Sequence, residues 1–144
     1  MDYFDTSFLT PLMLVEATTV EVQRFVSGLP REQLTTSHWA RVEFSSALGR
    51  EVRVGRLRPA QAAEVDLRFE ALIERSFRLL IPTLADFILA KSYVGDYATG
   101  LRAPDALHLA IAANNGAQTI FTLDSGMLRA GIVLGLPTNR GIAE

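Results

Sequence analysis

The chain has 144 residues, 49% hydrophobic and 21% charged, a composition typical of one packed globular domain that excludes a disordered chain. Sixteen acidic residues against 14 basic ones give a formal net charge of -2, so the chain has no overall field that would attract nucleic acid. The sequence has no cysteine, no apolar run of the roughly 18 residues that span a bilayer and no secretory-signal pattern, which together predict a cytoplasmic protein without a membrane partner.

Short strands and helices alternate in the first part of the chain. The predicted elements are a strand, two helices and a second strand, over residues 2–4, 10–17, 18–28 and 34–37. Thr10 followed by Pro11 is typical of a helix start, because proline fits the first helical position. Thr18 and Glu21 have the spacing of a capping box, which would open the second helix.

Two longer helices are predicted next, over residues 38–54 and 59–77. In the first, apolar residues recur at roughly helical spacing at Trp39, Val42, Ala47 and Val54. The second begins at a proline and carries a longer apolar stripe, formed by Ala62, Val65, Phe69, Leu72, Ile73 and Phe77. We interpret this stripe as part of the core.

The last part of the chain repeats the pattern. Its predicted elements are strands over 79–81, 119–123 and 132–134 and helices over 83–98 and 105–115. Short apolar strands separated by amphipathic helices predict an α/β fold with a mainly parallel sheet covered on both faces. We expect one domain over residues 1-144.

Four carboxylates are candidates for one shared site. Asp5 and Asp124 each follow a predicted strand, and the carboxyl ends of parallel strands are where functional groups gather. Asp105 lies at a helix start, where the helix dipole favours its ionised form. Glu43 lies within a helix on a largely apolar face. Four acids in one crevice would repel one another unless a divalent cation neutralised them, and Mg²⁺ or Mn²⁺ suits oxygen ligands.

Each acid also has a purely structural interpretation. Asp5 and Asp124 could be helix or turn caps, and Asp105 could simply stabilise a helix start. Glu43 could pair with Arg50, two turns further along the same helix. Only the occurrence of all four together favours a metal site.

Four segments of the chain have a familiar arrangement. They are Tyr-Phe-Asp-Thr-Ser at 3–7, Trp-Ala-Arg-Val-Glu-Phe at 39–44, Gly-Leu-Arg-Ala-Pro-Asp-Ala-Leu-His-Leu-Ala at 100–110 and Thr-Leu-Asp at 122–124. Together, and in this order, they resemble the PIN-domain ribonucleases, most closely the VapC-type toxins of bacterial toxin–antitoxin pairs. The third segment is the most specific, and the resemblance covers nearly the whole chain.

The resemblance implies a three-layer α/β/α domain and a metal-dependent endoribonuclease that hydrolyses RNA phosphodiester bonds. It assigns Asp5, Glu43, Asp105 and Asp124 as the catalytic residues that bind Mg²⁺ or Mn²⁺. It makes the hydroxyl residues Thr6, Ser7 and Thr122 polar supports for the carboxylates. It also implies a homodimer silenced by a cognate VapB-type antitoxin. One departure is Gly131, where the family often has alanine, and we expect this to affect helix packing more than chemistry.

Several other polar residues invite a functional interpretation. His108 could act as a general base, but a histidine within an Ala/Leu helix is more typical of the core. His38 is interpreted as structural or exposed. The basic cluster formed by Arg50, Arg53, Arg56 and Arg58 is interpreted as a solvated helix end, with contact to RNA phosphate or a partner as the alternative.

Two other functions compete with the nuclease hypothesis. The chain could be a catalytically silent PIN-like module that only binds a protein, although a scaffold gains nothing from concentrated negative charge. It could also be a Mg²⁺-dependent phosphatase or phospho-acceptor domain with Asp5 as nucleophile. The sequence disfavours the second alternative, because no Asp-x-Asp follows the first strand and the single Lys91 lies within a helix.

Overall fold

Five short strands form one parallel sheet in the computed structural model, which describes residues 1–143. Glu144, the last residue of the predicted domain, lies outside the described residues. The strands are β1 (Asp2–Phe4), β2 (Leu34–Ser37), β3 (Arg78–Leu80), β4 (Thr119–Phe121) and β5 (Thr138–Asn139). Their order across the sheet is β3-β2-β1-β4-β5, so the first strand is central and the chain winds outward from it in both directions.

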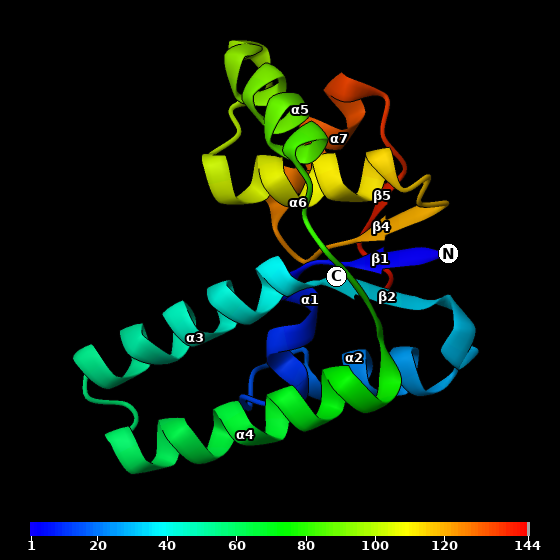
Figure 1. The fold of residues 1–144 in the computed structure, drawn as a ribbon. Helices are drawn as coiled ribbons and strands as arrows, with labels where there is room; N and C mark the ends of the chain where they lie inside the picture. The colour runs from blue at the N-terminus through cyan, green and yellow to red at the C-terminus, as the bar shows by residue number, and fades with distance from the viewer. Residues whose placement is uncertain (144) are drawn as a thin grey trace.

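Helices cover both faces of this sheet, as Figure 1 shows. One layer contains α1 (Thr6–Leu9), α2 (Thr19–Ser27), α3 (His38–Arg53) and α4 (Pro59–Ser76). The other contains α5 (Leu84–Gly95), α6 (Ala103–Asn114) and α7 (Ser125–Leu134). Three short 3-10 helices, η1 (Thr10–Leu12), η2 (Arg31–Gln33) and η3 (Tyr97–Thr99), complete the chain. The predicted three-layer α/β/α architecture is therefore confirmed.

The two faces of the sheet are buried in two separate cores. Successive strand residues point to opposite faces, so Tyr3 enters the core under α5, α6 and α7 while Phe4 enters the other. Ile120 and Phe121 divide in the same way. Burial on both faces explains why successive residues of the central strands, such as Ile120 and Phe121, are both apolar.

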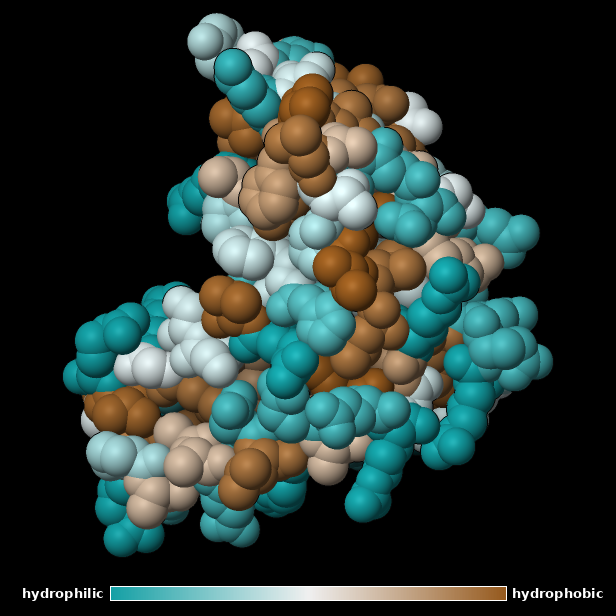
Figure 2. Space-filling model, viewed as in Figure 1, coloured by the Kyte–Doolittle hydropathy of each residue, from teal (hydrophilic) through white to brown (hydrophobic). Residues whose placement is uncertain are grey.

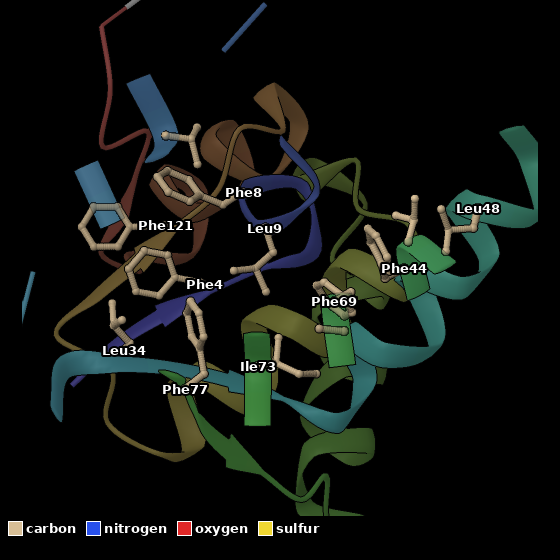
Figure 3. Packing of buried hydrophobic residues seen from close by; sticks show 13 residues of the cluster. Phe4, Phe8, Leu9, Leu34, Phe44, Leu48, Phe69, Ile73, Phe77 and Phe121 are labelled. Carbon is tan, nitrogen blue, oxygen red and sulfur yellow. The ribbon is translucent and has the colours of Figure 1, made fainter. Parts of the chain in front are cut away.

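Aromatic side chains dominate the core beneath α1 to α4 (Figure 3). Phe4 stacks on Phe121 with ring centroids 5.0 Å apart, and Phe44 of α3 stacks on Phe69 of α4 at 3.9 Å. The second stack joins two helices that project from the sheet as a long hairpin (Figure 1). The apolar stripe predicted on α4 is confirmed, with Phe69 fully buried in this core.

Two predicted elements are wrong. Residues 132–134 form the last turn of α7 rather than a strand, because Met127, Ala130 and Gly131 bury one helical face. The predicted helix over 10–17 is also wrong, since the chain becomes helical directly after β1, with Asp5 as the N-cap of α1. Only one turn of 3-10 helix follows.

Details of two other helices also differ from the prediction. Helix α3 buries Ala40, Phe44 and Leu48, whereas Val42 and Val54 of the predicted stripe are more than half exposed. Helix α2 is present, but its N-cap Thr18 makes no side-chain capping bond and has helical backbone angles. The capping box predicted there is therefore wrong.

The surface carries apolar side chains chiefly over α5. Leu84, Phe87 and Ile88 are 75%, 54% and 63% exposed, and Figure 2 shows apolar side chains gathered on this helix. No helix within residues 1–143 combines the length and apolar character needed to span a membrane. Figure 2 also shows that the outline is hollowed between α6 and α3, where the strands end.

Candidate functional site

Asp5 lies at the carboxyl end of the central strand and is held by hydrogen bonds from three residues. One oxygen accepts from the backbone N–H of Phe8 at 2.9 Å and from Ser7 Oγ at 2.8 Å. The other accepts from Thr122 Oγ1 at 2.6 Å. The carboxylate is 2% exposed, so these bonds satisfy an acid that the fold has removed from water. Two of the predicted polar supports, Ser7 and Thr122, therefore contact Asp5.

Glu43 approaches this region from the first half of α3. Its Oε1 accepts a hydrogen bond of 2.8 Å from Thr6 Oγ1, next to Asp5 in the sequence. The same oxygen contacts His108 Nε2, forming an ion pair when the imidazole is protonated. The sequence hypothesis that Glu43 pairs with Arg50 is wrong, because among residues 1–143 the ion-pair partner of Glu43 is His108.

His108 is buried, as its position in an Ala/Leu helix predicts, and joins Glu43 to the interior of the sheet. Its Nδ1 lies 2.7 Å from the hydroxyl of Tyr3, which lies 2.8 Å from Ser37 Oγ. The chain of contacts thus runs from β2 through β1 and α6 to α3. The bond to Tyr3 fixes the ring so that Nε2 faces Glu43, and this makes His108 a positioning residue.

Asp105 and Asp124 lie at the starts of two helices beside one polar pocket. Asp105 is in the first turn of α6, and Asp124 is the N-cap of α7, where its Oδ1 accepts from Met127 N at 2.8 Å. Both line a pocket of about 300 Å³ together with Arg102 and Arg129. Asp124 is exposed, and its backbone N–H donates to Thr122 Oγ1 at 3.0 Å. Thr122 thereby connects Asp124 to Asp5.

The acids perturb one another electrostatically. Burial raises the pKa of Asp105 to about 6, and the charges of Asp124, Glu43 and Asp5 add to this effect. Burial also raises the pKa of Asp5, against the opposing influence of His108 and of the hydrogen bonds from Thr122, Phe8 and Ser7. Burial alone would raise the pKa of Glu43, but its bonds to His108 and Thr6 outweigh burial and lower it. The four acids therefore share one electrostatic environment.

The residues suit a hard divalent cation in their chemistry, since all four offer carboxylate oxygens and their mutual repulsion favours a positive ligand. Within residues 1–143, no three His, Asp or Glu side chains are grouped as a ready-made metal site. Asp5, Glu43 and Asp124 instead direct oxygens to partners in the protein. A cation would therefore compete with these hydrogen bonds or bind some of the acids through water.

The other candidates lie away from this crevice. Arg50, Arg53, Arg56 and Arg58 are exposed at the far end of α3 and in the turn after it, and Arg56 pairs with Glu51 at 3.5 Å. His38 lies 3.1 Å from Arg41 on α3, as a structural role predicts.

Sequence reasoning missed three residues of the site. Tyr3 gives no signal, because its partner is 105 positions away in the chain. Arg102 belongs to the most specific motif, three residues before Asp105, but was assigned no role. Arg129 lies five residues after Asp124, and only the fold brings it into the same pocket.

Among the solved structures with a similar fold are three bacterial proteins. VapC20 from Mycobacterium tuberculosis, described as a Sarcin-Ricin loop cleaving toxin, matches with a TM-score of 0.73 and 18% identity over 91% of this chain and 95% of that one. FitAcB from Neisseria gonorrhoeae matches with a TM-score of 0.75 and 18% identity over 98% of both chains. VapBC-1 from nontypeable Haemophilus influenzae matches with a TM-score of 0.69 and 15% identity over 98% of both chains. These likenesses show the fold.

The sequence also matches the model of a known protein family. No curated protein matches the chain significantly. The model of the PIN domain matches residues 3–133, which include all four acids, His108 and the two arginines of the polar pocket. The chain belongs to the PIN domain family.

Proposed function

We propose that this chain is a Mg²⁺- or Mn²⁺-dependent endoribonuclease that acts as the toxin of a toxin–antitoxin pair. The observation that carries the proposal is the approach of four acids from distant parts of the sequence to the carboxyl end of the sheet. Thr122 links Asp5 to Asp124, and Asp105 lines the same pocket as Asp124. Glu43 is bonded to Thr6, the residue that follows Asp5. Concentrated, partly buried negative charge is unfavourable in a protein that only has to fold. A divalent cation would relieve it and would in turn attract an anionic phosphodiester.

In this proposal the four acids are the metal ligands, directly or through water. A bound divalent ion would supply an activated water and neutralise charge on the phosphoryl oxygens. Ser7 and Thr122 fix both oxygens of Asp5, so this carboxylate is oriented before any ligand arrives. Thr6 and His108 hold Glu43 on the opposite wall of the crevice. The preorganised carboxylates leave little reorganisation for the reaction itself.

The test is cleavage of a single-stranded RNA by the purified chain with Mg²⁺, with Mn²⁺ and with EDTA. Asp5→Asn and Asp105→Asn should each lower the rate by at least about a hundredfold, because each removes a charged ligand. Glu64→Gln is the matched control, since Glu64 is an exposed acid on α4 remote from the crevice. Cleavage that is insensitive to EDTA, or retained by both aspartate variants, would contradict the proposal.

Calorimetry with Mn²⁺ tests the metal separately from catalysis. The unaltered chain should bind the ion and Asp105→Asn should bind it more weakly, because a ligand and its charge are lost. If no binding is found at millimolar ion, the chain is better described as a silent PIN-like module that binds a protein partner.

We also propose that the chain forms a homodimer and is inhibited by a cognate antitoxin. Support comes from the similarity of the fold to FitAcB and VapBC-1, and from the exposed Phe87 and Ile88 on α5, which are typical of a covered surface. Light scattering on the full chain measures its mass. A single-chain mass at micromolar concentration would contradict the dimer, and activity unaffected by the product of a neighbouring antitoxin gene would contradict the inhibition.

A further inference from the structure

The polar pocket beside Asp105 and Asp124 contains two arginines that the proposed metal chemistry does not use. Arg102 is the N-cap residue of α6 and Arg129 lies in the second turn of α7. Both are exposed, and both line the pocket of about 300 Å³ that the two carboxylates also line. Within the part of the chain that the structure describes, neither guanidinium makes an ion pair or a side-chain hydrogen bond.

Arg129 extends toward the carboxylates rather than away from them. Side chains of a helix lean toward its N-terminus, which directs Arg129 back over the first turn of α7. A Cβ built on Gly126 would lie 3.9 Å from Arg129 Nη2 and 2.9 Å from Asp124 Oδ1. The guanidinium and the carboxylate therefore flank the same glycine, yet they do not pair with each other.

Two unpaired guanidiniums beside two carboxylates balance the formal charge of the pocket. Asp105 and Asp124 alone would repel a nucleic-acid strand, whereas Arg102 and Arg129 offer planar donors that match the non-bridging oxygens of a phosphodiester. Exposed lysines or scattered charges would not give this fit, because a guanidinium can donate two parallel hydrogen bonds to one phosphate.

We propose that Arg102 and Arg129 form a subsite for a backbone phosphate of single-stranded RNA, adjacent to the phosphodiester that would be hydrolysed at the four acids. The inference rests on the proposed ribonuclease function, because it names where that substrate is held. The arginines bind and position the strand. They carry no base specificity, since contacts to phosphate fix the register of a nucleic acid and not its sequence.

The first test measures binding without cleavage. Full-length chain in EDTA is titrated against fluorescein-labelled decauridylate, with anisotropy as the readout over a range of salt concentrations. Arg102→Gln and Arg129→Gln should each weaken binding by about tenfold at low salt. Each should also reduce the slope of log K against log salt by about 0.7, the contribution of one phosphate contact in a single strand. Arg68→Gln, an exposed arginine on α4, should change neither quantity.

The second test uses steady-state cleavage with Mn²⁺. Both variants should raise KM by a similar factor and leave kcat nearly unchanged, and Arg→Lys should restore part of the affinity because it keeps the charge and loses the planar fork. Each variant should melt at the same temperature as the unaltered chain, because both side chains are exposed. Equal melting temperatures would verify that the variants are folded.

The outcomes separate the two proposals. The subsite is refuted if the variants keep the wild-type Kd and salt slope, or if they lower kcat with KM unchanged. This holds whether or not the unaltered chain cleaves RNA. If the variants bind more weakly as stated but the unaltered chain cleaves no RNA with Mg²⁺ or Mn²⁺, the subsite stands and the ribonuclease proposal fails.

Discussion

Replacing Asp105 with asparagine should stabilise the chain at neutral pH while abolishing cleavage. In the fold the pKa of Asp105 is raised from 3.8 to about 6, first by burial and then by the neighbouring charges of Asp124, Glu43 and Asp5. A shift of about two pKa units corresponds to about 3 kcal/mol at about 1.36 kcal/mol per unit. Because the carboxylate is partly open to water, screening leaves roughly 1–2 kcal/mol as the destabilisation that asparagine would remove.

The pH dependence of this effect has a definite sign. Well below the unfolded pKa of 3.8 the carboxyl group is protonated in the folded and unfolded chain alike, so Asp105 and asparagine are nearly equivalent. As the pH rises from the unfolded pKa of 3.8 to the folded pKa of about 6, ionisation increasingly favours the unfolded chain. The gain from Asp105→Asn should therefore be small at pH 4, where ionisation of the unfolded chain has only begun to contribute, and full above about pH 7.

Urea unfolding at pH 4 and pH 7.5 without metal measures this difference, and thermal melting should show a rise of roughly 3–6 °C at the higher pH. Added Mn²⁺ should raise the melting temperature of the unaltered chain more than that of the variant, because only the former keeps all four acids. Glu64→Gln, on an exposed face of α4, serves as the control for a general loss of negative charge. A variant that is less stable than the unaltered chain at pH 7.5, or equally stabilised at pH 4, would refute the electrostatic reasoning.

Three further predictions concern packing. Gly131→Ala should destabilise the chain by about 1–3 kcal/mol, because the added Cβ would collide with Oγ1 and Cγ2 of Thr138. Thermal melts should show partial recovery in the double variant with Thr138→Ala, which removes these two atoms, and no recovery would mean the clash is not the cause. Phe69→Ala should lower the free energy of unfolding by about 3–5 kcal/mol in urea titrations, because it removes the stack on Phe44. Asp86→Ala should cost about 1–3 kcal/mol by the same assay, since this buried carboxylate both caps α5 and accepts from Asn114; a change within error would show that the capping bonds are replaceable.

The sequence was sufficient to predict the elements whose signals are local. The strand over 34–37 and the helix that begins at Pro59 follow from residue type and spacing, and both are confirmed. The helix α7 was mistaken for a strand because its end, Ile132-Val133-Leu134, is rich in β-branched residues. Packing of its earlier residues Met127 and Ala130 against the sheet overrides that local preference.

The same distinction applies to the site. Asp5 and Asp124 could be predicted at one end of the sheet because each follows a predicted strand, and Asp105 could be predicted at a helix start; the helices that Asp5 and Asp124 cap were not predicted. The link from Tyr3 through His108 to Glu43 could not be predicted, because it joins residues 105 and 65 positions apart through buried hydrogen bonds. Residue spacing contains no information about such contacts.

Two different kinds of contact stabilise the four acids. Three of them lie at helix N-termini, where backbone N–H groups and the helix dipole favour a carboxylate, as the bonds from Phe8 to Asp5 and from Met127 to Asp124 show. Glu43 lies within α3 and depends on His108 and Thr6 instead, which lower its pKa. The helix terminus does not suffice for Asp5 or Asp105, because burial keeps the pKa of both carboxyl groups raised. At Asp105 the charges of the other three acids add to burial, so a cation bound there would also relieve their repulsion.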